Sequence, residues 1–128
     1  MKLKKVYRGL EVYKGQITPY YFDFYVVYGA RSFIDFLKDK LKQTDEVIES
    51  FPLESDGFVA NRYYESTAIN LMYLNSGCNI ATMYHEALHM ALLMMEDKGI
   101  PINEPNSEVI AYHQEELAAA LLDFAEDK

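Results

Sequence analysis

Five consecutive residues of this chain, His85-Glu86-Ala87-Leu88-His89, form an HExxH sequence with the residue types and spacing that metal chemistry requires. In a helix, histidines four positions apart lie one turn apart on the same face, so both imidazoles can bind one metal ion. Glu86 then lies beside the metal without being a ligand, and it can accept a proton from a metal-bound water. The motif therefore predicts a zinc (Zn2+) site for metal-assisted hydrolysis.

A third protein ligand is needed to complete such a site, and the residues after His89 narrow its identity. A continuation to HExxHxxGxxH would supply a third histidine, but Leu92 stands at the glycine position and Met95 at the histidine position. That three-histidine class is therefore excluded. The other common arrangement takes a glutamate from the next helix, and Glu108 lies in the first turn after a loop.

With this glutamate the chain resembles the gluzincins, the thermolysin-like branch of zinc peptidases. In that family the third ligand is a glutamate roughly twenty residues after the second histidine, at a helix start of the form Glu-x-x-Ala/Ser. Glu108 follows His89 by 19 positions, and Ala111 completes the pattern. The resemblance is greatest to minimal zincin-like proteins, often phage- or prophage-encoded, and it covers about residues 67–125.

The resemblance implies both a site and a reaction. Zinc is expected to bind His85, His89 and Glu108, with water in the fourth position. Glu86 is expected to activate that water for attack on a peptide carbonyl and then to protonate the leaving amine. Tyr112 lies one helical turn after Glu108, where its phenol can donate a hydrogen bond to the developing oxyanion.

Helical periodicity leaves two interpretations of Glu108 open. Glu108, Tyr112 and Glu115 share the face opposite the apolar stripe of the last helix, so they form either a wall of the metal cleft or a solvated acidic surface. Glu104, Glu115 and His113 are the alternative third ligands, and His113 lies nearer the apolar stripe, as a core or outer-shell histidine does. The alternative to any metal site is a pair of core histidines hydrogen-bonded to nearby backbone.

Length and composition restrict the class of protein. The 128 residues suit a single domain, 1–128, and half of them are apolar while a quarter are charged, as in ordinary globular chains. A formal net charge of -8 argues against nucleic-acid binding, which depends on lysine and arginine. The single Cys78 cannot form an internal disulfide, and no apolar run approaches the roughly 20 residues of a membrane span. We therefore expect a soluble, cytoplasmic protein with no nucleic-acid or membrane partner.

Hydrophobic patterning predicts an α+β fold: a small mixed or antiparallel sheet, one helix in the N-terminal half and two C-terminal helices. The expected strands are residues 3–14, 18–28 with residues 21–28 as its clearest part, 58–64 and 67–74. The expected helices are 32–43, which begins at Ser32, then 80–97, and a last helix from Asn106 or Ser107 to about Glu126. Residues 44–57 form a connection with a helical turn near 45–50.

The helix that carries the motif is apolar on nearly every side, which predicts burial between other elements. Two histidines and a glutamate in such a position would be costly unless a metal satisfied both imidazoles. The helix ends at Lys98-Gly99-Ile100-Pro101, where a cation is followed by a glycine and a proline. The last helix has an expected core stripe of Ile110, His113, Leu117, Leu121 and Phe124.

Two classes of function are consistent with the sequence. The first is a zinc-dependent peptidase acting on a peptide or protein substrate, which would pair as an extended strand with residues 67–74. The second is a catalytically silent zincin-like domain that binds or regulates a protein partner and uses zinc as a structural element. In either class the ligand types also allow a different divalent metal. The acidic surface favours basic or neutral peptides over acidic ones.

Overall fold

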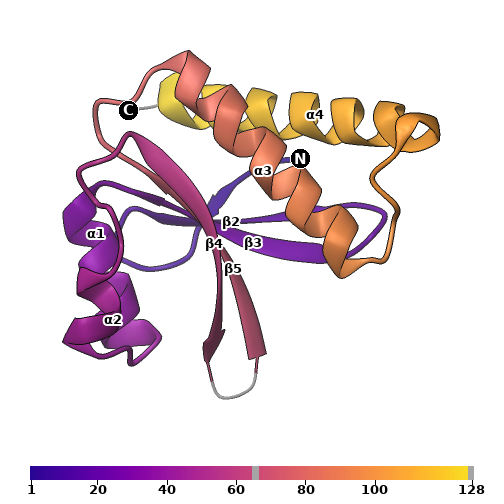
Figure 1. Cartoon of the computed structure of the whole chain (residues 1–128). Coiled ribbons are helices and arrows are strands. Elements are labelled where there is room, and N and C mark those ends of the chain that lie inside the picture. Colours follow the sequence, from indigo (N-terminus) through magenta and orange to yellow (C-terminus); the bar gives the residue numbers. More distant parts are fainter. Residues whose placement is uncertain (65–66, 127–128) are drawn as a thin grey trace.

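A computed structural model of the chain describes residues 1–64 and 67–126, and it has the predicted α+β architecture (Figure 1). In chain order the strands are β1 (Lys4–Lys5), β2 (Val12–Ile17), β3 (Phe22–Tyr28), β4 (Gly57–Tyr64) and β5 (Thr67–Leu74). The helices are α1 (Ala30–Asp35), α2 (Asp45–Glu49), α3 (Ile80–Asp97) and α4 (Ser107–Glu126). A π-helical segment, η1 (Phe36–Lys40), follows α1, and a 3-10 turn, η2 (Glu104–Asn106), precedes α4.

The five strands form one mixed sheet in the order β1-β2-β3-β5-β4. Neighbouring strands are antiparallel except β3 and β5, which run parallel with Tyr25 opposite Leu71 and Tyr28 opposite Leu74. β5 therefore has partners on both sides, whereas β4 pairs with β5 alone among the described residues. An edge strand such as β4 leaves one row of backbone N–H and C=O groups without a strand partner.

Helices cover both faces of the sheet, so the chain has two hydrophobic cores (Figure 1). Alternation along β5 shows the division, because successive side chains of a strand point to opposite faces. Met72 and Leu74 face α3 and α4, while Leu71 and Tyr73 face the layer of α1, η1 and α2. All four side chains are fully buried. α3 and α4 also pack against one another, so α3 is held by the sheet and by α4 together.

The N-terminal half differs from the prediction of two long strands. Residues 4–17 form a hairpin of β1 and β2 instead of the single strand predicted over 3–14, and the chain reverses near Gly9, whose φ is 82°. Positive φ favours glycine at this turn. The prediction was wrong because half-buried turn residues such as Leu10 continue the apolar alternation. The second predicted strand, which is clearest over residues 21–28, is confirmed as β3, and residues 18–21 make the turn between β2 and β3.

The first helix departs from its predicted range of 32–43. α1 begins before Ser32, whose hydroxyl accepts a hydrogen bond from the Glu11 backbone N–H (3.0 Å) instead of capping a helix. The helical path then continues through η1. The predicted turn near 45–50 is confirmed as α2, which Thr44 caps with its side chain.

The C-terminal half follows the prediction closely. β4, β5 and α3 occupy the predicted ranges to within one residue, and α4 ends at the predicted Glu126. Asn79 caps α3 by accepting a hydrogen bond from the Thr82 backbone N–H (3.0 Å). In the parts of the chain that the structure describes, none of the helices is both long and apolar enough to cross a lipid bilayer.

Candidate metal centre

One stripe of α3 lines a cleft and carries both histidines of the motif. The stripe recurs every three or four residues and consists of His85, His89, Leu92 and Glu96. The buried side chains of α3 are Met83, Glu86, Ala87, Met90, Ala91, Met94 and Met95. The predicted burial of the helix is thus confirmed for the face that these seven residues form, whereas Ile80 and Tyr84 are exposed. It is wrong for the two histidines, which are exposed because their face opens onto a cleft.

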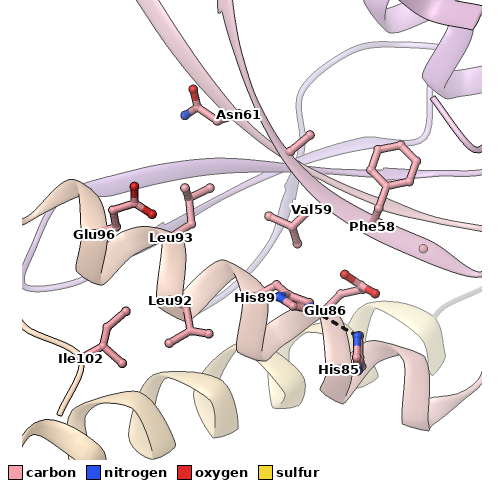
Figure 2. A pocket seen from close by; sticks show the side chains of 12 residues that line it. Phe58, Val59, Asn61, His85, Glu86, His89, Leu92, Leu93, Glu96 and Ile102 are labelled. Carbon is pink, nitrogen blue, oxygen red and sulfur yellow. Dashed lines mark hydrogen bonds between the residues drawn. The ribbon is translucent and has the colours of Figure 1, made fainter. Parts of the chain in front are cut away.

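This cleft has a volume of about 620 Å³ and lies between α3 and the edge strand β4 (Figure 2). Its lining comes from the first part of β4, from α3 and from the loop after α3: Gly57, Phe58, Val59, Ala60, Asn61, His85, Glu86, His89, Leu92, Leu93, Glu96 and Ile102. A second hollow of about 370 Å³ lies at the start of α3 and shares Gly57, His85 and Glu86 with the first. The motif therefore lies where the two hollows meet.

The two motif histidines converge on one point. Their Nε2 atoms lie 3.2 Å apart, and their ring centroids lie 4.8 Å apart. Two imidazole nitrogens bound to one tetrahedral zinc ion, each at about 2.0–2.1 Å, lie about 3.3 Å from one another. The separation of the His85 and His89 nitrogens therefore matches that of two ligands of a single zinc ion.

Glu86 is the buried member of the motif, with 5% of its surface exposed. Its Oε1 atom is enclosed and has no hydrogen-bond partner among the described residues, although buried polar atoms are nearly always paired. Burial raises the pKa of Glu86 above the usual glutamate value, and the neighbouring His85 and His89 oppose that rise. An unpaired carboxyl oxygen beside two converging imidazoles suits a proton-accepting glutamate at a metal, so these residues fit the zinc that the motif predicts.

The close approach of α3 to β4 depends on Gly57. An added Cβ at this position would lie 2.8 Å from the Tyr73 carbonyl oxygen and 3.3 Å from both Glu86 Cγ and Thr82 Cγ2. A larger residue would therefore push the helix and the strand apart, as overpacking does in a core. Sequence reasoning missed Gly57 as a site residue, and the available signal was a glycine at the first position of a strand.

The residues predicted on α4 are not assembled with the histidines. Glu108 and Tyr112 are exposed, Tyr112 by 62%, and neither lines the cleft. Among residues 1–64 and 67–126, no three His, Cys, Asp or Glu side chains are grouped so as to hold one metal ion. The orientation of α4 about its own axis explains this exposure. Leu117 and Leu121 pack into the core, and the face that carries Glu108 is therefore left on the surface. The assignment of Glu108 as a ligand stays a prediction.

The alternative ligands also lie away from the cleft. Glu104 and Glu115 are exposed, and neither is among its lining residues. His113 is only 3% exposed, and its ring packs edge-on against Tyr20 with 5.4 Å between centroids. Its Nδ1 lies 3.4 Å from Glu116 Oε1. His113 is therefore a core histidine, as its place in the apolar stripe predicted.

The strand that borders the cleft is β4, so the prediction that a peptide pairs with residues 67–74 was wrong. Those residues form β5, which from Leu71 to Leu74 pairs with β3 on one side and with β4 on the other. The edge on the cleft side belongs to β4. The two strands of a hairpin have similar apolar patterns, and only the position of β3 decides which of them is covered.

Comparison of the chain with protein-family models, with curated proteins and with solved structures found no match. A function is therefore inferred from the motif, from the cleft and from the geometry of His85, Glu86 and His89.

Proposed function

We propose that this protein is a zinc-dependent peptidase. The observation that carries the proposal is the arrangement of the motif side chains in the cleft. His85 and His89 meet at 3.2 Å beside the buried carboxyl of Glu86, which lacks a partner among the described residues. Such a site combines a place for a metal, a proton acceptor and an open groove for a substrate, which together suit metal-assisted hydrolysis.

In this proposal His85 and His89 hold the metal from the cleft, and Glu108, which does not line the cleft, is the proposed third ligand. The imidazoles come from adjacent turns of α3, and Glu108 comes from the first turn of α4, the helix that packs against α3. The Glu108 carboxylate has no hydrogen bond or ion pair with the described residues, so it is available as a ligand. When bound, zinc would acidify a water molecule and polarise the substrate carbonyl.

Glu86 acts as the proton carrier of the reaction. Its carboxylate accepts a proton from the attacking water and returns it to the nitrogen of the leaving amine. The enclosure that raises its pKa suits both halves of this role, because a more basic carboxylate accepts the proton more readily and holds it until the amine leaves.

The substrate is an extended peptide that pairs with the edge strand β4. Backbone hydrogen bonds to a free sheet edge hold a peptide irrespective of its sequence, and pockets for alternate side chains select among sequences. The hollows of about 620 and 370 Å³ extend to either side of His85 and Glu86, which gives room for residues before and after the scissile bond.

Tyr112 is the proposed donor to the oxyanion that develops on the substrate carbonyl. Its ring packs edge-on against His113 with 5.1 Å between centroids, and its hydroxyl has no hydrogen-bond partner among the described residues. Tyr112 and Glu108 share one face of α4, one turn apart. The role of Tyr112 therefore depends on that of Glu108.

A second function is favoured by the direct contact between the two imidazoles. Nitrogens that converge to 3.2 Å supply two ligands for a zinc ion, and this convergence does not by itself require catalysis. The protein would then be a catalytically silent zincin-like domain that binds or regulates a protein partner, with zinc as a structural element.

Zinc-dependent cleavage of peptides separates these two functions. The purified protein is expected to cleave casein or a mixed peptide library, to lose this activity on chelation and to regain it when zinc is restored, because the metal supplies the Lewis acid. Mass spectrometry identifies the products. A zinc-loaded protein that cleaves no peptide, but melts at a lower temperature after chelation, would contradict the peptidase and support the silent domain.

Replacement of Glu108 tests the third ligand. Glu108→Gln is expected to weaken zinc binding by at least about 100-fold, since even the loss of an outer-shell partner costs about 10- to 100-fold. Competition with a fluorescent chelator measures the affinity. Glu115→Gln removes the same charge from the same exposed face of α4 and serves as the matched control. Equal zinc affinity in Glu108→Gln and the parent would exclude Glu108, and a loss in Glu115→Gln alone would assign the role to Glu115.

A further inference from the structure

The end of the cleft away from His85 combines aliphatic walls with hydrogen-bond acceptors (Figure 2). We call this region the acidic end of the cleft, and it consists of Asn61, Leu92, Leu93, Glu96 and Ile102. The two leucines come from α3, and Ile102, which is 58% exposed, comes from the loop after it. Aliphatic surface next to a carboxylate suits a long side chain with an apolar stem and a polar head.

The carboxylate of Glu96 is not neutralised by a cation of the chain. It is exposed and forms no ion pair with any of the described residues. Lys98 lies two residues further on, but its Nζ is 3.4 Å from the carboxylate of Asp97. The guanidinium of Arg62 lies over the ring of Phe51, 4.5 Å from its centroid, and Phe51 belongs to the core on the opposite face of the sheet. Glu96 therefore has an unbalanced negative charge in the cleft.

Asn61 adds an acceptor at the same end. Its side-chain NH2 donates to the Asn70 side-chain oxygen at 2.7 Å, and the Asn70 NH2 donates to the Asp23 backbone oxygen at 3.0 Å. This chain of hydrogen bonds orients the Asn61 amide and leaves its oxygen as the free group. An amide oxygen and a carboxylate both accept hydrogen bonds, so a ligand that satisfies both must be a donor. Ammonium and guanidinium groups carry donors only.

Charge is unevenly distributed along the chain, and the part that lines the cleft is the negatively charged part. Residues 1–44 contain nine Lys or Arg and four Asp or Glu, whereas residues 45–128 contain three Lys or Arg and sixteen Asp or Glu. Every residue that lines the two hollows belongs to the acidic part. Each hollow has a carboxylate at its own end, Glu96 in one and Asp56 in the other, and no Lys or Arg is among their described lining residues. Complementary charge steers cationic ligands to such a cleft.

We propose that the acidic end of the cleft is a subsite for the side chain of an arginine or lysine in a bound peptide. The aliphatic stem packs on Leu92, Leu93 and Ile102, and the cationic head reaches Glu96 and Asn61. This subsite rests on the proposed function, which supplies the extended peptide. Glu96 follows His89 by seven positions along α3, a rise of about 10 Å. The cationic residue therefore lies roughly two or three residues from the bond that faces the motif.

Binding to a variant that does not turn over tests the subsite. Zinc-loaded Glu86→Gln protein is titrated with labelled leucine–alanine peptides that carry a single arginine at successive positions, and with counterparts that carry neutral, isosteric citrulline. Fluorescence anisotropy measures the affinities. At the preferred position, arginine is expected to bind about five- to tenfold more tightly than citrulline, as suits a partly exposed charge-assisted contact. The preference for arginine over citrulline is expected to decline as the salt concentration is raised.

Glu96→Gln, added to the same protein, is expected to remove the preference for arginine and to leave citrulline binding unchanged. Asp123→Asn is the control, because it removes one negative charge from an exposed residue of α4 that does not line the cleft and has no ion pair with the described residues. Equal affinities for arginine and citrulline at every position, or an equal loss of preference in Asp123→Asn, would overturn the proposal. So would the absence of binding by any peptide.

The subsite and the peptidase can fail separately. Selective binding of arginine peptides together with no cleavage by the parent protein would retain the subsite and remove the peptidase. Cleavage of arginine and citrulline peptides with equal kcat/KM would retain the peptidase and remove the subsite. The ratio of these kcat/KM values on the parent, compared with the ratio on Glu96→Gln alone, also serves as the second measurement if Glu86→Gln does not fold.

Discussion

Glu86→Gln is expected to lower kcat for peptide hydrolysis by about 10² to 10⁴-fold and to leave the zinc content unchanged. A positioned general base contributes a factor of that size, and an amide cannot accept the proton. Glutamine has nearly the shape of glutamate, so the buried position between α3 and Gly57 stays filled. Initial rates on a fluorogenic peptide and metal analysis of the same preparation give the two readouts.

The matched control for this variant is Glu46→Gln. Glu46 is exposed in the first turn of α2, on the other face of the sheet, so the exchange removes the same charge far from the cleft. It is expected to change neither the rate nor the zinc content. Cleavage by Glu86→Gln at the parent rate would show that the mechanism is wrong, and loss of zinc from this variant would place Glu86 among the ligands.

His89→Gln is expected to abolish zinc binding at micromolar metal and, with it, all hydrolysis. One of two converging nitrogens is lost, and the loss of a direct ligand should exceed the roughly 10- to 100-fold cost of losing an outer-shell partner. Zinc binding to the folded parent at 100 times its Kd would add about 2.7 kcal/mol to the free energy of unfolding. The parent should therefore melt at a higher temperature with zinc than without it, and His89→Gln should show no such shift.

The chain supplies its own control for this experiment in its third histidine. His113 is a buried core residue of α4 that packs against Tyr20, outside the cleft. His113→Gln is expected to lower the melting temperature with and without zinc, because it disturbs the core. The shift produced by zinc should remain. A zinc-dependent shift that persists in His89→Gln and disappears in His113→Gln would move the metal site to α4.

The C-terminal elements could be predicted because their signals are local. α3 ends where the sequence places Lys98 and Gly99, and Gly99 adopts a φ of 68°, which favours glycine. The apolar period of α4 is confirmed by the burial of Leu117, Leu121 and Phe124. Caps, turns and helical periodicity involve residues only a few positions apart. The local sequence therefore determines where these helices begin, end and bury their apolar face.

The N-terminal strands could not be predicted in the same way. Apolar alternation through residues 3–14 is typical of a strand, but it is equally produced by a hairpin whose turn residues are half-buried. Strand pairing is a long-range property: β3 pairs with β5, more than forty residues later in the chain. This pairing covers β5 and leaves β4 at the edge, which reversed the expectation about the strand that meets a substrate.

By itself, the sequence determined that His85, Glu86 and His89 lie within one turn of a helix, because helical geometry sets that spacing in any fold. Only the tertiary structure decided which of them is buried. The approach of α3 to β4 at Gly57 encloses Glu86 and leaves the histidines in the cleft. The packing of α4 likewise left Glu108 outside that cleft. Contacts between side chains that are distant in sequence determine which face each helix turns toward the core. A local sequence pattern does not specify these contacts.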